Sequence, residues 1–350
     1  MQQPDDAFAR PTAADPAAQT TASAPPASRG EERDAADLHT PVLLQRCVDL
    51  LAPALQAPGS VYVDATLGMG GHSEAVLEAC PNATLVGLDR DTDAIALAGR
   101  RLARFGDRVR LVHTVYDGFA DALDSLGIPE VHGVLFDLGV SSLQLDDVDR
   151  GFSYARDAPL DMRMDRTSGA TAEDVVNEYG EHELRDLFYR YGDEKLAPRY
   201  ASRIVRERAT ARITTTGRLV DILQEATPAA KRSAGHPAKR VFQALRIEVN
   251  RELEALERAL PQALDRLAIG GRIVVESYQS LEDRFVKRTL QAATTSTAPH
   301  DLPVVPEEHA PEFTLVVRGA EQADAAEAAR NPRAIPVRLR AAERIRRHAA

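Results

Sequence analysis

The stretch V-Y-V-D-A-T-L-G-M-G-G-H-S, residues 61–73, constrains the fold of this chain more than any other. Its first four residues read as a short strand, because β-branched valines alternate with other residues. The glycines that follow, Gly68, Gly70 and Gly71, permit a tight turn, since glycine lacks a Cβ and tolerates positive φ. A helix is expected directly afterwards, over residues 72–80, so its free N–H groups face whatever binds on the turn.

Two classes of ligand commonly bind such a turn, and the nearby carboxylates distinguish them. A dinucleotide fingerprint is G-x-G-x-x-G/A, with an acidic residue about 20 positions further on. Here Gly68-x-Gly70-x-x-Ser73 approximates it, and Asp89 lies at about that distance. Asp64, however, directly precedes the turn, where a carboxylate repels a pyrophosphate and attracts an ammonium group. S-adenosylmethionine carries an ammonium group, and its ribose hydroxyls can pair with Asp89. The turn therefore favours this methyl donor, with an ordinary tight turn of an α/β domain as the alternative.

The composition is that of an ordinary globular protein. The chain has 350 residues, of which 44% are hydrophobic and 27% charged, enough for one large domain or two. No apolar run approaches the ~20 residues of a membrane span, and no signal-peptide core is evident, so we expect a cytoplasmic protein. The two cysteines, Cys47 and Cys80, are expected to be reduced thiols in the core. The scattered histidines form no ligand pattern, so no metal is expected.

Between residues 61 and 137, strands and helices alternate with short connections. Strands are expected at 61–64, 84–88, 109–115 and 133–136, and helices at 72–80, 92–105 and 119–126. This alternation predicts an α/β fold with a parallel sheet and helices on both faces. Ligands bind such sheets beyond the carboxyl ends of the strands. The residues at or just past those ends are Asp64, Asp89, Tyr116 and Asp137.

The remainder of the chain divides by pattern. We expect a disordered tail at 1–36, the first part of the sheet domain at 37–142, a mostly helical insertion at 143–235 for substrate recognition, and the second part of the domain at 236–350. Residues 39–51 predict an amphipathic helix with Pro41 in its first turn. Helices are expected within the insertion at 172–179, 182–191 and 195–208.

A long helix is expected to return the chain to the sheet, with Pro261 kinking or restarting it. Its apolar stripe comprises Phe242, Leu245, Val249, Leu253, Leu256 and Leu260. A fifth strand at 272–276 and a helix at 281–293 follow, and then an antiparallel hairpin of 313–317 and 337–340 at the sheet edge.

Ten short strings, in this order, match one known family. They are H-T-P-V-L-L (39–44), D-A-T-L-G-M-G-G-H-S (64–73), L-D-R-D (88–91), D-L-G-V-S-S (137–142), Q-L-D-D (144–147), R-G-F-S (150–153), P-L-D-M-R-M-D (159–165), H-P-A-K-R-V-F-Q-A-L-R-I-E-V-N (236–250), S-L-E-D-R (280–284) and N-P-R-A (331–334). The chain thereby resembles the bacterial MraW/RsmH-type methyltransferases, which modify the exocyclic N4 amine of a cytidine in small-subunit ribosomal RNA. The resemblance spans residues 38–346.

This resemblance implies a Rossmann-like S-adenosylmethionine-dependent methyltransferase sheet with an inserted, mostly helical subdomain. Together with Asp64, it assigns the donor site to Gly70, Gly71, His72, Asp89, Tyr116, Asp137 and Gln144. Three positions depart from the family pattern. Tyr116 stands where Phe is common, Leu143 replaces a frequent Pro, and Gln279 replaces the usual His. A proton-transfer role at the last position is therefore not expected to carry over.

The chemistry suggests which residues act on the acceptor. The cytosine amine is a weak nucleophile, so the enzyme must chiefly position it, and good orientation supplies ~7–11 kcal/mol. We expect Asp137, Ser141 and Ser142 near the amine, and Asp161 and Arg163 around the base. The alternatives are that Asp137 only binds donor, that Asp161 and Arg163 form an internal ion pair, and that His72 merely starts a helix.

The expected partner is ribosomal RNA within an assembled small subunit. A net charge of −10 argues against indiscriminate nucleic-acid binding, so phosphate contacts must come from local basic clusters. The candidates are Lys231, Arg232, His236, Lys239 and Arg240; Arg199, Arg203, Arg206 and Arg208; and Arg338, Arg340, Arg344, Arg346 and Arg347. Solvated faces are the alternative, and a homodimer is compatible with the sequence.

Three other functions agree less well with the sequence. A DNA or protein amino-methyltransferase is less favoured because D-L-G-V replaces the D-P-P-Y-type string of many such enzymes. A nicotinamide-dependent oxidoreductase is disfavoured by Asp64. A non-catalytic RNA-binding module would not need the acidic residues at the carboxyl ends of the strands.

Overall fold

The computed structural model describes residues 41–231, 235–299 and 306–347. The fold described below belongs to the compact unit of residues 35–350. The predicted disordered tail and the predicted start of the first helix lie outside the described residues. Within the described part of the chain, no helix has both the length and the apolar character needed to cross a bilayer.

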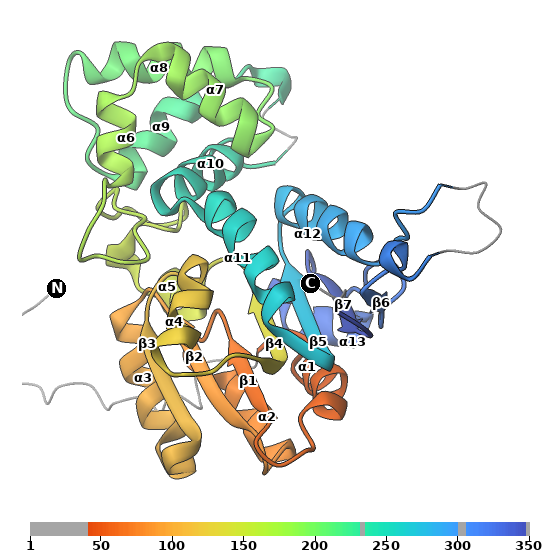
Figure 1. Ribbon diagram of the computed structural model, residues 1–350. Coiled ribbons are helices and arrows are strands. Elements are labelled where there is room, and N and C mark those ends of the chain that lie inside the picture. Colours follow the sequence, from red (N-terminus) through yellow and green to blue (C-terminus); the bar gives the residue numbers. More distant parts are fainter. Residues whose placement is uncertain (1–40, 232–234, 300–305, 348–350) are drawn as a thin grey trace, which may run out of the picture. The chain divides into compact units, whose positions relative to one another are not determined.

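A seven-stranded mixed sheet forms the centre of this unit (Figure 1), in the order β3-β2-β1-β4-β5-β7-β6. The parallel strands are β1 (Val61–Asp64), β2 (Thr84–Asp89), β3 (Val109–His113), β4 (Val131–Asp137) and β5 (Leu267–Ser277). β7 (Arg338–Arg344) pairs antiparallel with β5, and β6 (Phe313–Leu315) pairs antiparallel with β7 at the edge, so β6 runs in the same direction as the parallel strands. The predicted parallel sheet and the predicted C-terminal hairpin are both confirmed, and the fold is Rossmann-like.

Helices cover both faces of the sheet, because residues within each strand alternate between two hydrophobic clusters. In β4, Leu135 packs on one face, and Val134 and Phe136 pack on the other. The first cluster includes residues of α1 (Leu44–Leu51), α2 (Gly71–Ala79) and α3 (Thr92–Leu102). The second includes residues of α4 (Phe119–Ser125), α11 (Glu252–Arg266) and α12 (Ser280–Ala293). A short helix, α13 (Ala325–Arg330), precedes β7.

The first helix starts later than the sequence predicted. Pro41 is not in its first turn, because α1 begins at Leu44 after Leu43, whose φ of 45° places it in the left-handed region. That conformation ends the preceding turn and fixes where the helix starts. Pro41 instead packs against the glycine turn, where its ring lies 2.5 Å from the position of a Cβ on Gly71.

The insertion is helical, as predicted. Its helices are α5 (Ser142–Asp146), α6 (Ala172–Glu178), α7 (Glu181–Gly192), α8 (Ala197–Arg208) and α9 (Thr216–Ala226). Among its described residues the only β pairing is one isolated bridge between Pro159 and Thr215. α9 was not predicted. The hydrophobic cluster of this region also includes α10 (Ala238–Asn250) as far as Ile247. The expected boundary at residues 235–236 therefore falls within one packed cluster, and the domain division stays a prediction.

The long returning helix breaks at Arg251 and not at Pro261, so that prediction is wrong. Arg251 has a φ of 51° and separates α10 from α11, whereas Pro261 lies inside α11. Hydrogen bonds to residues far away in the sequence hold the chain at this break. The Asn250 amide donates to the Met162 carbonyl and accepts from the Met164 N–H, at 2.8 and 2.7 Å.

Candidate active site

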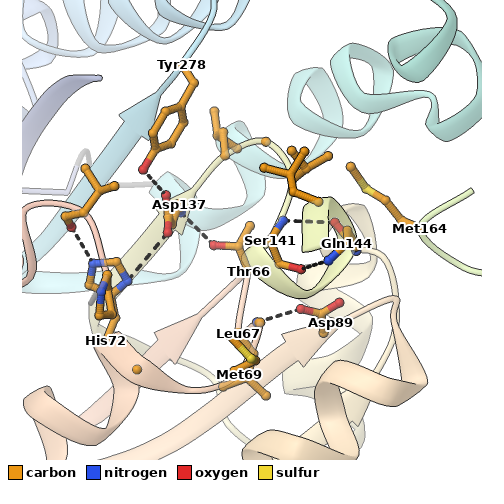
Figure 2. A pocket seen from close by; sticks show the side chains of 18 of the residues that line it. Thr66, Leu67, Met69, His72, Asp89, Asp137, Ser141, Gln144, Met164 and Tyr278 are labelled. Atoms are coloured by element: carbon orange, nitrogen blue, oxygen red, sulfur yellow. Dashed lines mark hydrogen bonds and ion pairs between the residues drawn. The ribbon is translucent and has the colours of Figure 1, made fainter. Parts of the chain in front are cut away.

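A cavity of about 360 Å³ lies at the carboxyl ends of the central strands, between the glycine turn and the segment after β4 (Figure 2). Seven of the predicted residues line it: Gly71, His72, Asp89, Tyr116, Asp137, Ser141 and Gln144. The side chain of Ser142 lies outside what the structure describes. Asp64 and Gly70 are not among the lining residues. The predicted rim is therefore largely brought together in one place.

The glycine turn has the backbone conformation that its sequence predicted. Gly68 and Gly70 have φ values of 51° and 78°, which side chains with a Cβ rarely adopt. The Gly70 N–H closes the turn on the Leu67 carbonyl at 2.9 Å, and α2 begins at the next residue. At Gly68 and Gly71 the turn thus presents main chain to the cavity, next to the lining residues Leu67 and Met69.

Asp64 supports the turn and does not face the cavity. Its carboxylate is 1% exposed and accepts a hydrogen bond from the Ser73 hydroxyl at 2.7 Å and from the Thr66 N–H at 3.2 Å. Burial raises the pKa of Asp64 above its usual value, and the Ser73 hydrogen bond opposes that rise. The expectation that this carboxylate meets an ammonium group of the ligand is not supported, because Ser73 and the turn cover it.

Asp89 ends β2 and faces the cavity. Its two carboxylate oxygens accept the N–H groups of Gly68 and Asp91, at 2.7 and 2.8 Å. Burial raises the pKa of Asp89 to about 6, and these two backbone hydrogen bonds lower it in part. Each carboxylate oxygen has a second lone pair for a ligand hydroxyl. The residue is therefore an acceptor whose charge depends on pH near neutrality.

Asp137 ends β4 on the other side of the cavity and is held by three groups (Figure 2). The Tyr278 hydroxyl donates to its Oδ1 at 2.8 Å, and its backbone N–H donates to the Thr66 hydroxyl at 2.6 Å. His72 Nδ1 lies 3.7 Å from Oδ2. Burial and the Asp137 charge raise the pKa of Tyr278 well above its usual value, so Tyr278 remains a hydrogen-bond donor. Oδ2 is consequently the carboxylate oxygen left to accept from a ligand.

Gln144 and Ser141 form the first turn of α5. The Ser141 hydroxyl accepts the Gln144 N–H, and the Gln144 side-chain oxygen accepts the Ser141 N–H, which makes a reciprocal capping box. The Gln144 amide also donates to Asp91 Oδ2 at 3.1 Å. Asp91 forms a buried ion pair with Arg150, so the segment after β2 is tied directly to the start of the insertion.

Tyr116 packs its ring edge against Phe136, with the two ring centroids 5.8 Å apart. Its hydroxyl donates to the Glu252 carbonyl at 3.1 Å, which fixes the ring as a wall of the cavity. Burial raises the pKa of this phenol. An aromatic wall suits the flat base of a nucleoside.

Two residues predicted around the base lie elsewhere. Asp161 and Arg163 pair with each other at 2.8 and 3.0 Å, and neither lines the cavity. The Arg163 pair and hydrogen bonds hold the pKa of Asp161 below its usual range, although burial opposes this. The alternative, an internal ion pair that orders the loop before α6, therefore describes them.

Several predicted RNA-binding arginines are occupied by partners within the chain. Arg203, Arg340, Arg344 and Arg347 form ion pairs with carboxylates, and Arg208 and Arg240 donate to backbone carbonyls. Arg199, Arg206 and Lys239 are exposed and form no ion pair within the described part of the chain. Arg232 and the Lys231 side chain lie outside it.

The cavity also includes residues that the sequence did not identify. Thr66 and Tyr278 hold Asp137, while Arg246 lines the wall and pairs with Glu252 at 2.9 Å. Tyr278 lies just after β5, so extending the strand-end argument to the fifth strand would have found it. Gln279, where the family usually has His, caps α12 by a reciprocal bond with Glu282, and so serves the helix.

One histidine lies in a grouping that the scattered histidines of the sequence did not indicate, and the expected absence of a metal stays a prediction. His72 lies beside Cys47 and Glu276, with one ligand atom of each within 4.8 Å of the others. The three residues come from α1, α2 and β5, so no spacing in the sequence could have indicated them.

A seven-stranded sheet with an antiparallel penultimate strand, a glycine turn after β1 and a cavity above that turn define a Rossmann-like methyltransferase fold. The family model described as the MraW methylase family matches residues 36–345, and the chain belongs to this family.

Its relatives include proteins named "Ribosomal RNA small subunit methyltransferase H". That of Clavibacter michiganensis subsp. michiganensis is 71% identical over 314 residues, which cover 90% of this chain and 99% of the relative. That of Leifsonia xyli subsp. xyli is 70% identical, covering 89% and 95%. That of Saccharopolyspora erythraea is 62% identical, covering 89% and 95%.

Proposed function

We propose that the protein transfers a methyl group from S-adenosylmethionine to the exocyclic N4 amine of a cytidine in small-subunit ribosomal RNA. One observation carries the proposal: six residues of the family's donor motif, distant in sequence, line a single cavity. They are Gly71, His72, Asp89, Tyr116, Asp137 and Gln144. The names of the relatives, at up to 71% identity, support small-subunit ribosomal RNA as the substrate. The resemblance supports the cytidine amine.

The cavity fits the donor by shape and by chemistry. Its volume of about 360 Å³ lies within the range of small-molecule sites. The glycine turn lets main-chain N–H groups approach a ligand closely, and Asp89 accepts hydrogen bonds of the kind that ribose hydroxyls donate. When bound, S-adenosylmethionine supplies a methyl group on a positively charged sulfur, with a neutral leaving group. Tyr116 and Gln144 would hold the nucleoside part.

The residues of this chain have three tasks towards the acceptor. They orient the amine, accept its hydrogen bonds and let a proton leave after transfer. Asp137 Oδ2 suits the second task because Tyr278 already occupies Oδ1. Ser141 lines the same cavity and extends the polar surface, and Ser142 stays a predicted neighbour. A base must be unstacked to enter such a cavity.

The first test is methyl transfer from labelled S-adenosylmethionine to small ribosomal subunits from cells that lack the gene. We expect N4-methylcytidine in the nucleoside mass spectrum of the RNA from these subunits. Parallel reactions with naked ribosomal RNA show whether an assembled surface is needed. If protein that binds donor labels neither substrate, the proposal is wrong, and DNA and protein amines become the next substrates to assay.

A further inference from the structure

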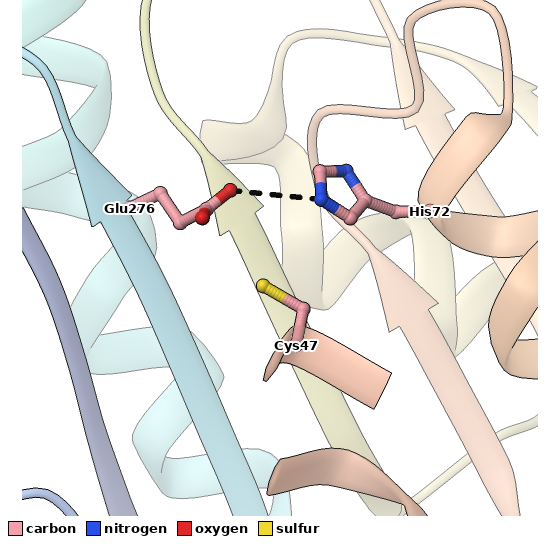
Figure 3. Close-up of side chains that lie close together, drawn as sticks. All are labelled: Cys47, His72 and Glu276. Atoms are coloured by element: carbon pink, nitrogen blue, oxygen red, sulfur yellow. Dashed lines mark ion pairs between the residues drawn. The ribbon is translucent and has the colours of Figure 1, made fainter. Parts of the chain in front are cut away.

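Three side chains of metal-ligand type lie close together (Figure 3), and one of them lines the active-site cavity. They are Cys47 of α1, His72 of α2 and Glu276 of β5. Their exposed fractions are 0%, 6% and 0%. His72 also lines the active-site cavity, whereas Cys47 and Glu276 do not line it and have no role in the reaction proposed above.

Glu276 lacks a hydrogen-bond partner. Neither carboxylate oxygen is hydrogen-bonded to any described residue, and both are inaccessible to solvent. The Cys47 thiol and the Asp137 carboxylate lie beside this carboxyl group, and His72 Nε2 lies 3.7 Å from Oε2, which is too far for a hydrogen bond. Asp137 is the register partner of Glu276 on β4 and adds a second negative charge. A buried carboxylate without a partner costs several kcal/mol, so this position demands either a proton or a cation.

The donor set is that of a zinc-type ion. Thiolate, imidazole and carboxylate are the ligands that Zn²⁺ takes, at roughly 2.3, 2.0 and 2.1 Å. Thiolate and carboxylate together carry two negative charges, which a divalent cation neutralises. The ligand atoms lie within 4.8 Å of one another, whereas tetrahedral ligands are separated by roughly 3.5 Å. Small side-chain rotations therefore suffice to close the site.

The position of His72 supports the same assignment. Its Nε2 lies 2.9 Å from the Val42 carbonyl and faces Glu276, while its Nδ1 faces Asp137 Oδ2. With a metal on Nε2, the proton moves to Nδ1, where Asp137 accepts it. This is the carboxylate–histidine–metal arrangement that orients metal-bound imidazoles.

We propose that Cys47, His72 and Glu276 bind a divalent cation of the zinc class. Binding releases the proton of the Cys47 thiol and any proton on Glu276, and no bond is oxidised or reduced. The ion is a structural support behind the cavity: it fixes the imidazole that faces Asp137 and is not itself exposed to the acceptor. The assignment rests on the geometry of these three residues and not on the proposed substrate.

The test is a cobalt titration of the full-length protein after removal of metal with a chelator. A tetrahedral cobalt–thiolate centre absorbs in the near ultraviolet by charge transfer and in the visible by d–d transitions, and Zn²⁺ should displace it. We expect one equivalent to bind. Cys47→Ser should abolish the charge-transfer band, and Glu276→Gln should weaken cobalt affinity at least tenfold. Cys80→Ser, the change at the other buried cysteine, should leave the spectrum unchanged.

X-ray absorption at the zinc edge of the unaltered protein gives a second measurement that no folding defect can confuse. One sulfur at about 2.3 Å among lighter ligands supports the site. A shell of oxygen and nitrogen alone overturns it, as does a native, donor-binding protein that gives no cobalt spectrum. A band that survives Cys47→Ser and disappears in Cys80→Ser also overturns it. In each of these cases a proton, and not a cation, neutralises Glu276.

Discussion

At the scale of single residues, the site depends on two aspartates whose surroundings differ. Asp89 accepts hydrogen bonds from two backbone N–H groups, yet burial still raises its pKa to about 6. Asp137 is held by a phenol, a threonine hydroxyl and a nearby imidazole. In the proposed function, the first binds the ribose hydroxyls of the donor and the second receives the acceptor amine.

Donor affinity should depend on pH through Asp89. An ionised carboxylate accepts hydroxyl hydrogen bonds better than the neutral acid, so affinity should rise with pH up to about 6 and level off above it. Below that value we expect a loss of up to about tenfold per pH unit. Calorimetry from pH 5 to 8 measures it. Asp89→Asn should bind about 10–100-fold more weakly at pH 8, with a flat profile. An unchanged slope in this variant would assign the titration to another group.

Asp137→Asn separates the two roles considered for that residue. If Asp137 contacts the amine, the variant should bind donor within a few-fold of the parent and lose about 10²–10⁴ in turnover. Equilibrium donor binding and single-turnover methylation of isolated subunits measure the two effects. Tyr278→Phe is the matched control, because it removes only the hydrogen bond to Oδ1. Full turnover by Asp137→Asn with normal donor binding would leave donor contact as its only role.

At the scale of helices and strands, the elements that depend on local sequence pattern could be predicted, whereas those that depend on contacts with distant residues could not. β1, β2 and β4 were predictable because their apolar runs and terminal carboxylates are properties of the local sequence. The break between α10 and α11 was not, because it depends on Asn250 bonding to Met162 and Met164, more than 80 residues away. The cluster of Cys47, His72 and Glu276 was unpredictable for the same reason.

Another such distant contact, the Arg150–Asp91 ion pair, gives a stability prediction. Both side chains are almost fully buried, and Arg150→Met leaves the Asp91 carboxylate without its countercharge. We expect a loss of about 3–5 kcal/mol in the free energy of unfolding, measured by urea denaturation. Arg203→Met is the control, because its pair with Glu225 is partly exposed and should cost less than about 1 kcal/mol. Equal losses in the two variants would contradict the buried-charge argument.

At the scale of the whole molecule, an acidic chain must bind a polyanion through a small part of its surface. The sequence indicated fourteen basic candidates, but charge alone cannot show which are already paired within the fold. Arg203, Arg340 and Arg344 form ion pairs with the chain's own carboxylates. Arg199 and Arg206 of α8 are exposed, form no ion pair with another described residue, and lie seven residues apart on one helix face. Phosphate contacts are therefore expected at α8.

The double change Arg199→Ala/Arg206→Ala tests this surface. Two lost phosphate contacts should weaken binding to small subunits and lower the slope of log affinity against log salt by roughly 1.5, because fewer counterions are released. Donor affinity should not change, since neither residue lines the cavity. Arg212→Ala is the control, because its guanidinium is already paired with Glu173 and Asp174. If the control lowers the slope as much as the double change, the effect comes from net charge and not from contacts made by α8. If neither variant alters it, RNA binds another face of the molecule.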